Sequence, residues 1–147
     1  MTFLTMIIIV SALPAAISAQ ATQEKEKEII RNVIVTSYVD GIFNEGSVNK
    51  IKLGWYPECD INIYNVQKDT CIKSKAFRFI PMFEKNPVGL TPGTTCKIPM
   101  VHVTGYAAIA IVEIYHGGKQ IYTDYMNLYK FSNGWKIVTK TFYAFPK

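Results

Sequence analysis

The sequence predicts an α+β fold in which N-terminal helices pack on the concave face of a cone-shaped, strongly curved antiparallel sheet. Three observations predict it: apolar residues at helical spacing over residues 22–45, strand-like segments from residue 98 onward, and glycine-containing turns between those segments. Helices followed by a meander of strands are typical of an α+β domain. The chain of 147 residues is long enough for one such domain with its own core.

The first helix is expected to begin near Thr22, a capping residue, and to end at Gly46, which tolerates the left-handed conformation that follows a helix. Its apolar residues at helical spacing predict one face that packs on the sheet. These residues are Ile30, Ile34, Tyr38 and Ile42.

The middle of the chain is less regular. A short helix is expected over residues 47–56, ended by Pro57, and an alternating strand follows from Cys59 to Val66. Residues 73–97 contain several prolines and glycines and are predicted to be a loop with one helical turn. Such a loop is a candidate rim or lid of a site.

Four long strands, over 98–104, 107–115, 120–131 and 135–143, are predicted to form the sheet. A three-residue loop at 132–134 would pair Phe131 with Trp135, and a Gly117-Gly118 turn would pair Ile114 with Ile121. This register collects the charged side chains on one face, which we assign to the outside. The outer residues include Asp124, Met126, Leu128, Lys130, Lys136, Val138 and Lys140.

The inner, helix-covered face then combines aromatic residues with neutral polar ones, while Ala108 and Ala110 leave space beside them. Two interpretations remain open: a closed ladder of Thr and Asn hydrogen bonds, or a ligand cavity with polar anchors. For the cavity, the predicted ligand-binding residues are Tyr38, Trp55, Tyr125, Asn127, Tyr129, Thr139, Thr141 and Tyr143.

Five stretches carry a family resemblance that extends from Glu24 to Tyr143. They are GIFNEG (41–46), LGWYP (53–57), VTGYAAIA (103–110), YTDYMNL (122–128) and NGWKIVTKTF (133–142). They resemble the nuclear transport factor 2-like superfamily, and within it the bacterial subgroup named "Putative lumazine-binding". The resemblance implies the cone fold. It also implies a range of activities, because this superfamily includes isomerases, dehydratases, cyclases, assembly domains and carriers, and the subgroup's name implies a pteridine-like ligand.

The predicted function is an exported domain that binds a small planar or apolar molecule between the sheet and the first helix. In the predicted register no Asp, Glu or His lies on the inner strand face, so no catalytic residue is assigned. The alternative is an isomerase or dehydratase that uses His102 or Asp40 as its base. A third hypothesis is a protein-interaction module whose cone is filled by its own side chains.

Partners and cofactors follow from composition. The sequence indicates no cofactor and no metal, because it has no C-x-x-C pair and its two histidines are far apart. The net charge of +5 comes from scattered lysines, which does not favour a nucleic-acid partner. Apolar residues between the lysines of the outer sheet face predict a homodimer through that face. The three cysteines allow at most one internal disulfide.

The first nineteen residues carry no charge and have an apolar centre at Met6–Val10, with small residues before position 20. This pattern is typical of a secretory signal peptide cleaved after Ala19 or Ala21, with one domain over 22–147 in the periplasm or outside the cell. The apolar run is short and contains Pro14, so stable membrane insertion is not expected.

The mature protein is therefore expected to begin at Gln20 or Thr22. N-terminal sequencing of the protein purified from its native host measures this directly. An intact Met1 in the soluble cytoplasmic fraction would contradict the prediction.

Overall fold

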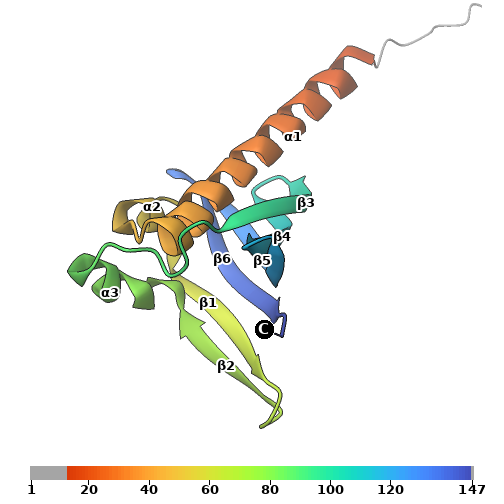
Figure 1. Ribbon diagram of the computed structural model, residues 1–147. Coiled ribbons are helices and arrows are strands. Elements are labelled where there is room, and N and C mark those ends of the chain that lie inside the picture. The colour runs from red at the N-terminus through yellow and green to blue at the C-terminus, as the bar shows by residue number, and fades with distance from the viewer. Residues whose placement is uncertain (1–12, 147) are drawn as a thin grey trace, which may run out of the picture.

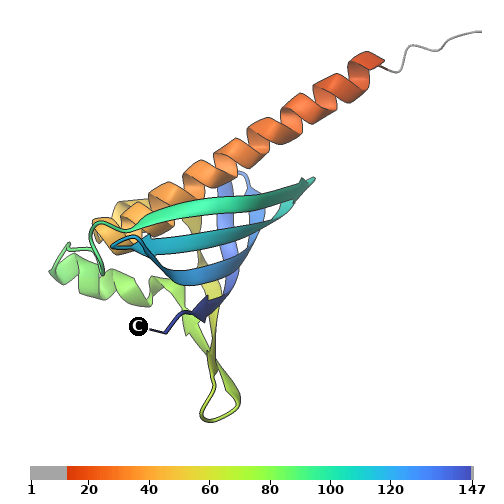
Figure 2. The same cartoon turned by 45° about the vertical axis from the view of Figure 1, so that its right-hand side comes forward.

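The computed structural model describes residues 13–146, and the larger part of the predicted signal peptide lies outside them. A long helix crosses one face of a curved sheet, and its N-terminal part extends beyond the sheet edge (Figures 1 and 2). The elements in order are α1 (Leu13–Ile34), η1 (Val35–Asn44), α2 (Val48–Gly54), β1 (Trp55–Asn65), β2 (Thr70–Lys75), η2 (Ala76–Phe79), α3 (Ile80–Lys85), β3 (Thr95–Thr104), β4 (Ala107–His116), β5 (Lys119–Phe131) and β6 (Gly134–Ala144). No helix within this range is long and apolar enough to cross a membrane.

The α+β class and the curved sheet are confirmed, but the sheet is mixed and not purely antiparallel. Its strand order is β2-β1-β6-β5-β4-β3. Strands β3 to β6 form the predicted antiparallel meander, whereas β1 pairs with β6 in parallel, for example Asp60 opposite Thr139. The parallel pair was not predicted because it joins the first and last strands of the chain.

The first helix has the predicted buried face, but it begins earlier and changes its geometry. Helix α1 is already formed before Thr22, and from Val35 it continues as the π-helix η1. The helical turn is wider there, because its hydrogen bonds join residues five apart. For example, the Glu45 amide donates to the Asp40 carbonyl at 2.8 Å. The helix ends before Gly46, as predicted, with φ of 65° at that glycine. The four predicted core residues are buried: Ile30, Ile34, Tyr38 and Ile42.

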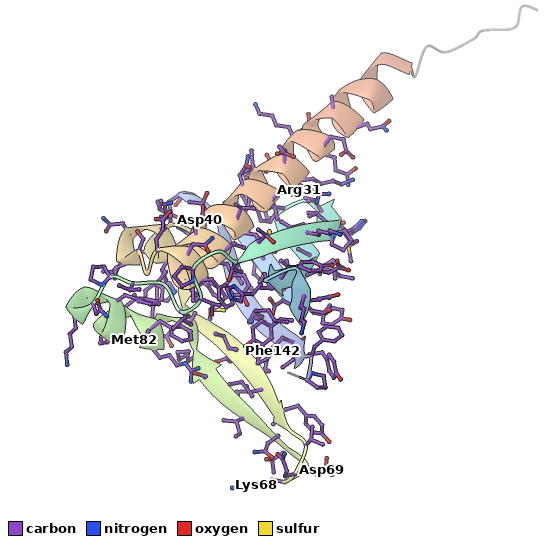
Figure 3. The ribbon with its side chains drawn as sticks, viewed as in Figure 1. Arg31, Asp40, Lys68, Asp69, Met82 and Phe142 are labelled. Atoms are coloured by element: carbon purple, nitrogen blue, oxygen red, sulfur yellow. The ribbon has the colours of Figure 1, made fainter. Side chains whose placement is uncertain are left out.

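Two elements in the middle of the chain differ from the prediction. Helix α2 is capped by Ser47, whose side chain accepts from the Lys50 amide, and it ends at Gly54. Pro57 therefore lies in β1 and does not end the helix. Residues 70–85 form an edge strand and two short helices, not a loop. The β1–β2 hairpin extends away from the helices, with Lys68 and Asp69 at its tip (Figure 3).

A β-bulge at Ile121 reverses the predicted faces of β5. Beside the glycine turn, Tyr115 lies opposite Gln120, yet the next pair is Ile114 with Tyr122, so Ile121 has no residue opposite it. One extra residue moves every later side chain of the strand to the other face. Met126 and Leu128, predicted to be outside, are 1% exposed beneath the helices.

The β5–β6 hairpin is also corrected at its turn. Phe131 pairs with Gly134 and Trp135 with Lys130, so the predicted Phe131–Trp135 pair does not form. A second bulge, at Val138, then restores the register that was predicted further along. Beyond it, the predicted pairs of Asn127 with Thr139 and of Tyr125 with Thr141 are both present.

Helix α1 is held on the sheet by polar contacts as well as by its apolar face. Glu26 accepts 2.6 Å hydrogen bonds from Lys130 and from the Trp135 indole, and these lower the pKa of Glu26. Gln23 donates to the Val103 carbonyl at 2.8 Å, and Arg31 donates to the Ile98 carbonyl. The helix is thus fixed to both ends of the meander.

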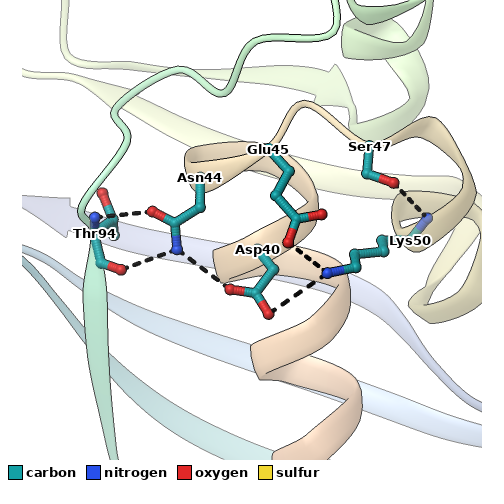
Figure 4. A network of polar contacts seen from close by, with 6 residues as sticks. All are labelled: Asp40, Asn44, Glu45, Ser47, Lys50 and Thr94. Atoms are coloured by element: carbon teal, nitrogen blue, oxygen red, sulfur yellow. Dashed lines mark hydrogen bonds and ion pairs between the residues drawn. The ribbon is translucent and has the colours of Figure 1, made fainter.

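The C-terminal end of η1 is tied to the loop before β3. Asn44 bonds both the amide and the carbonyl of Thr94, and it also donates to Asp40 (Figure 4). Lys50 completes the network with Glu45 at 2.5 Å and Asp40 at 3.9 Å. Gly89 is required here, because a Cβ would lie 2.1 Å from the Phe43 carbonyl oxygen. The loop therefore lies directly on the end of the helix.

Candidate functional site

A pocket of about 190 Å³ lies between η1 and the sheet, and it is the candidate site. Its walls come from η1, β1, η2, the loop before β3, β5 and β6, so distant parts of the chain meet there. The lining residues are Tyr38, Ile42, Phe43, Ile61, Ile63, Arg78, Phe79, Leu90, Tyr122, Lys140 and Phe142. Figure 3 labels Phe142 near the centre of the molecule, below α1.

The loop region predicted as a rim contributes three of these residues. Arg78 and Phe79 belong to η2, and Leu90 follows Gly89 in the loop that packs on η1. The Leu90 amide donates to the Ile42 carbonyl at 3.0 Å, which fixes this wall to the helix. The rim is therefore held by backbone hydrogen bonds.

A buried polar triad forms the inner end of the pocket. The Lys140 ammonium lies 2.6 Å from Asp124 Oδ1 and donates to the Tyr38 hydroxyl oxygen at 2.8 Å. Asp124 is fully buried, and Tyr38 and Lys140 are 3% and 6% exposed. The second carboxylate oxygen, Asp124 Oδ2, is buried without a hydrogen-bond partner among residues 13–146. Lys140 also lies over the rings of Phe142 and Tyr38, 4.4 and 4.7 Å from their centroids.

Burial dominates the ionisation of the triad. It raises the pKa of Asp124 and lowers the pKa of Lys140, in both cases against the attraction between the two charges. The Asp124 shift favours folding below its unfolded pKa of 3.8 and is lost as pH rises through the folded value. The Lys140 shift favours folding above 10.5 and is lost as pH falls through the folded value. Between these limits the charged pair is held in the core at a cost in stability.

A costly buried pair beside a pocket is a mark of a functional site. Burial, and then the charge of Asp124 and a hydrogen bond to it, raise the pKa of Tyr38 well above its usual range, so its hydroxyl stays protonated. The triad can therefore bind a polar atom or exchange a proton with one. This corrects the prediction that no titratable group lies on the inner strand face, since Asp124 and Lys140 both do.

Only two of the eight predicted site residues lie beneath the helices. Tyr38 lines the pocket, and Trp55 packs behind it, with ring centroids 5.4 Å apart and the indole donating to the Ser37 carbonyl. The other six lie on the open face of the sheet, and this corrects the predicted cavity. They are Tyr125, Asn127, Tyr129, Thr139, Thr141 and Tyr143.

The polar pair at the centre of the open face is satisfied internally. Asn127 Nδ2 donates to Thr139 Oγ1 at 2.7 Å, the contact expected of a Thr and Asn ladder. Both residues border a broad surface depression with His102, Thr104 and Tyr129. The neighbouring tyrosines are half exposed: Tyr125 51%, Tyr129 53% and Tyr143 56%.

The two bases considered for an enzyme lie away from the pocket. His102 pairs with Ile109 on β4 and is exposed on the open face, as a two-residue turn at Gly105-Tyr106 requires. Asp40 lies in the polar network at the end of η1, bound to Asn44 and Lys50. Neither is among the residues that line the pocket.

The three cysteines are free thiols in this structure. Cys59 is buried, and burial raises the pKa of its thiol to about 12, so it stays protonated at neutral pH. Cys71 is exposed on the edge strand β2, and Cys96 is partly buried on β3.

The profile of the family described as "Putative lumazine-binding" matches residues 23–143. One similar solved structure is an NTF2-like protein of unknown function from Shewanella baltica OS155, with 18% sequence identity and a TM-score of 0.67 over 84% of this chain and 97% of that one. Another is an NTF2-like protein of unknown function from Methylobacillus flagellatus KT, with 17% identity and a TM-score of 0.61 over 83% of this chain and 94% of that one. The association domain of CaMKII from C. elegans is also similar, with 11% identity and a TM-score of 0.54 over 85% of this chain and 97% of that one. A search of curated proteins finds none that matches the sequence.

Removing one member of the buried pair should destabilise the protein far more than removing both. Lys140→Met or Asp124→Leu alone leaves an uncompensated buried charge, and we expect each to lower the free energy of unfolding by about 3–5 kcal/mol. The double variant should lose far less than the sum of the two. Urea unfolding at pH 7 measures the cycle.

The matched control is Lys130→Met, which breaks the more exposed contact to Glu26 and should cost about 0–1 kcal/mol. If the single variants have the same free energy of unfolding as the wild type, removing one partner leaves no uncompensated charge in the core, and the prediction is wrong.

Proposed function

Because this chain belongs to the "Putative lumazine-binding" family and has the nuclear transport factor 2-like fold, we propose that it binds a small planar molecule in the pocket between η1 and the sheet. The observation that carries the proposal is the combination of aromatic walls with the buried Lys140 and Tyr38. Concave apolar sites with a few converging polar groups are the usual form of ligand sites.

The size of the pocket limits the ligand. Sites for drug-sized molecules occupy roughly 300–1,000 Å³, and this pocket has about 190 Å³. A ligand of one or two rings suits that volume, whereas a longer chain or a dinucleotide does not. The pocket is therefore proposed as a site for a compact metabolite.

The shape of the walls favours a flat ligand. Phe43 and Tyr122 lie with their centroids 6.2 Å apart, and Tyr122 meets Phe142 edge to face at 5.6 Å. Aromatic rings favour offset and edge-to-face contacts with another ring, which add about 0.5–1.5 kcal/mol to the burial of its surface. Lumazine, the bicyclic heterocycle in the family's description, is a fitting first probe.

Filling the pocket should abolish this binding. Ile63→Trp places a large side chain on the β1 wall, and we expect at least a tenfold loss of affinity, about 1.4 kcal/mol, because the ligand and the indole compete for the same space. Calorimetric titration with lumazine and other one- and two-ring aromatics measures it.

Val66→Trp is the matched control, because Val66 is 72% exposed at the hairpin tip and does not line the pocket. It should bind like the wild type. Equal affinity of the wild type and both variants for every bound aromatic would reject this pocket as the site.

Proton-transfer catalysis in the same pocket is the second candidate function. The observation that favours it is the triad, in which Tyr38 and Lys140 line the pocket and Asp124 lies directly behind them. Tyr38 or Lys140 would then replace His102 and Asp40 as the group in reach of a substrate. Catalysis would differ from simple binding in that Tyr38→Phe would lower turnover more than affinity.

We also propose that two copies associate through the open sheet face. In place of the lysine-rich surface expected from the sequence, the centre of this face carries neutral side chains, including Ile109 at 43%, Tyr125 at 51% and Tyr129 at 53% exposed. A two-fold pair brings the same patch of both copies together, and neutral aromatic residues do so without charge repulsion. An association domain among the similar folds supports such a use of the fold.

The export of the domain remains part of the proposal. The uncharged leader supports it, and so does the position of the first helix contacts. Gln23 and Glu26 hold α1 to the sheet just after the expected cleavage points, so a chain that begins at Gln20 or Thr22 keeps these contacts.

A charge on the open face should separate the proposed dimer. Tyr125→Lys and Tyr129→Lys place like charges against each other across the two-fold axis, and burial of an unpaired charge is costly. Light scattering should show monomers, with the fold kept because both side chains are half exposed.

Tyr64→Lys, at the hairpin tip, is the control that should remain dimeric. A wild-type protein that stays monomeric at millimolar concentration would overturn the dimer proposal.

A further inference from the structure

We propose that the ligand of this pocket is an anion: a small planar acid whose charged oxygen is bound by Lys140 and attracted by Arg78. The inference rests on the proposed function, since it names the chemical class of molecule that the same pocket takes. Three features carry it: the free donor at the inner end, the charges of the wall, and the position of the buried carboxylate.

The inner end of the pocket offers one free hydrogen-bond donor, on Lys140. An ammonium group has three N–H bonds, and within residues 13–146 two of them are used, toward Asp124 and Tyr38. The third remains for the pocket that Lys140 lines. Tyr38 lines the same pocket, but its hydroxyl accepts from Lys140 and is hydrogen-bonded to Asp124, so it is held within the triad. One N–H donor that carries a full positive charge forms a site for one oxygen atom of an anion.

The charged residues of the wall have a single sign. Lys140 and Arg78 are the two charged side chains among the lining residues, and no acid accompanies them. Arg78 is exposed and lies with its guanidinium 4.8 Å from the Phe79 ring centroid, at the outer side of the pocket. A ligand entering past Arg78 toward Lys140 thus approaches one cation and then another.

The carboxylate of Asp124 does not change this balance, because it does not line the pocket. It is fully buried and contacts the side of the ammonium through Oδ1. It therefore holds Lys140 in place and offsets part of its charge. A cationic ligand would be repelled by both wall charges, and a neutral one would leave the remaining Lys140 donor without a charged acceptor.

The rings beside Lys140 explain why the acid should be planar. Phe142 and Tyr38 lie against the ammonium at 4.4 and 4.7 Å, and Tyr122 lies at 5.9 Å. A flat ring that places its acidic group on Lys140 would lie along these aromatic faces. An aromatic carboxylate is the simplest molecule that meets both conditions.

Matched pairs of probes test the inference. Benzoate and benzamide, and nicotinate and nicotinamide, have nearly the same shape and differ in charge. In NMR titrations at pH 7 we expect the acids to bind at least tenfold more tightly than their amides. Lys140→Met should remove this preference, and Arg78→Gln should reduce it several-fold, more so at low salt.

Arg78→Gln keeps the test valid if Lys140→Met fails to fold, because Arg78 is exposed and its loss does not disturb the core. Lys85→Gln is the matched control, since it removes the same charge from α3 at a residue that does not line the pocket. It should keep the wild-type preference for acids.

Each remaining outcome overturns a distinct statement. Amides that bind as tightly as the acids would reject the anion while the binding pocket stands. A preference for acids that Arg78→Gln and Lys140→Met both leave unchanged would show that these two cations are not its source, and would overturn the inference. If neither the acids, the amides nor lumazine bind, the proposed binding function fails and this inference fails with it.

Discussion

The faces of the sheet are decided by single extra residues in two strands. At Ile121 the bulge turns Asp124, Met126 and Leu128 toward the helices, and without it they would face outward. The bulge at Val138 then brings Lys140 onto the same side as Asp124, with Met126 opposite Lys140 in the ladder. The core, the buried ion pair and the neutral open face therefore all depend on the positions of these two bulges.

The interior that results combines stabilising and costly features. Burying side chains such as Ile30, Ile34 and Leu128 stabilises the fold by about 1.5–3 kcal/mol each. This stabilisation offsets the cost of keeping the polar group of the buried ion pair in the same core. The widened turns of η1 set Tyr38 against that group, while the Asn44 network fixes the end of the same helix. Local irregularities, two bulges and a π-helix, thus surround the pocket, and the regular elements support it.

The sequence predicted the fold well because its signals were local. Periodicity and turns predicted the apolar spacing of the first helix, its stop at Gly46 and the three strand pairings of the meander. The site was assigned to the wrong face for a physical reason. Sorting charged residues to the outside assumes that buried charges are absent, and Asp124 and Lys140 violate that assumption by pairing with each other. Each of the two charged residues lies two positions from an aromatic residue of its own strand, Asp124 from Tyr122 and Lys140 from Phe142. This spacing was the available signal, but it can be interpreted only once the bulges are known.

The parallel pairing of β1 with β6 also has a consequence for the order of folding. Residues 55–65 find their neighbour only when residues 134–144 exist, so the two strands are closed by a segment of some seventy residues. Such non-local contacts form late and slow the folding of a domain. Ile61 lies beside Lys140 in this parallel pair, and Ile63 and Phe142 line the pocket with them. A growing chain can therefore assemble its helices and the β3–β4–β5 meander early, whereas the pocket cannot exist until the last strand has been made.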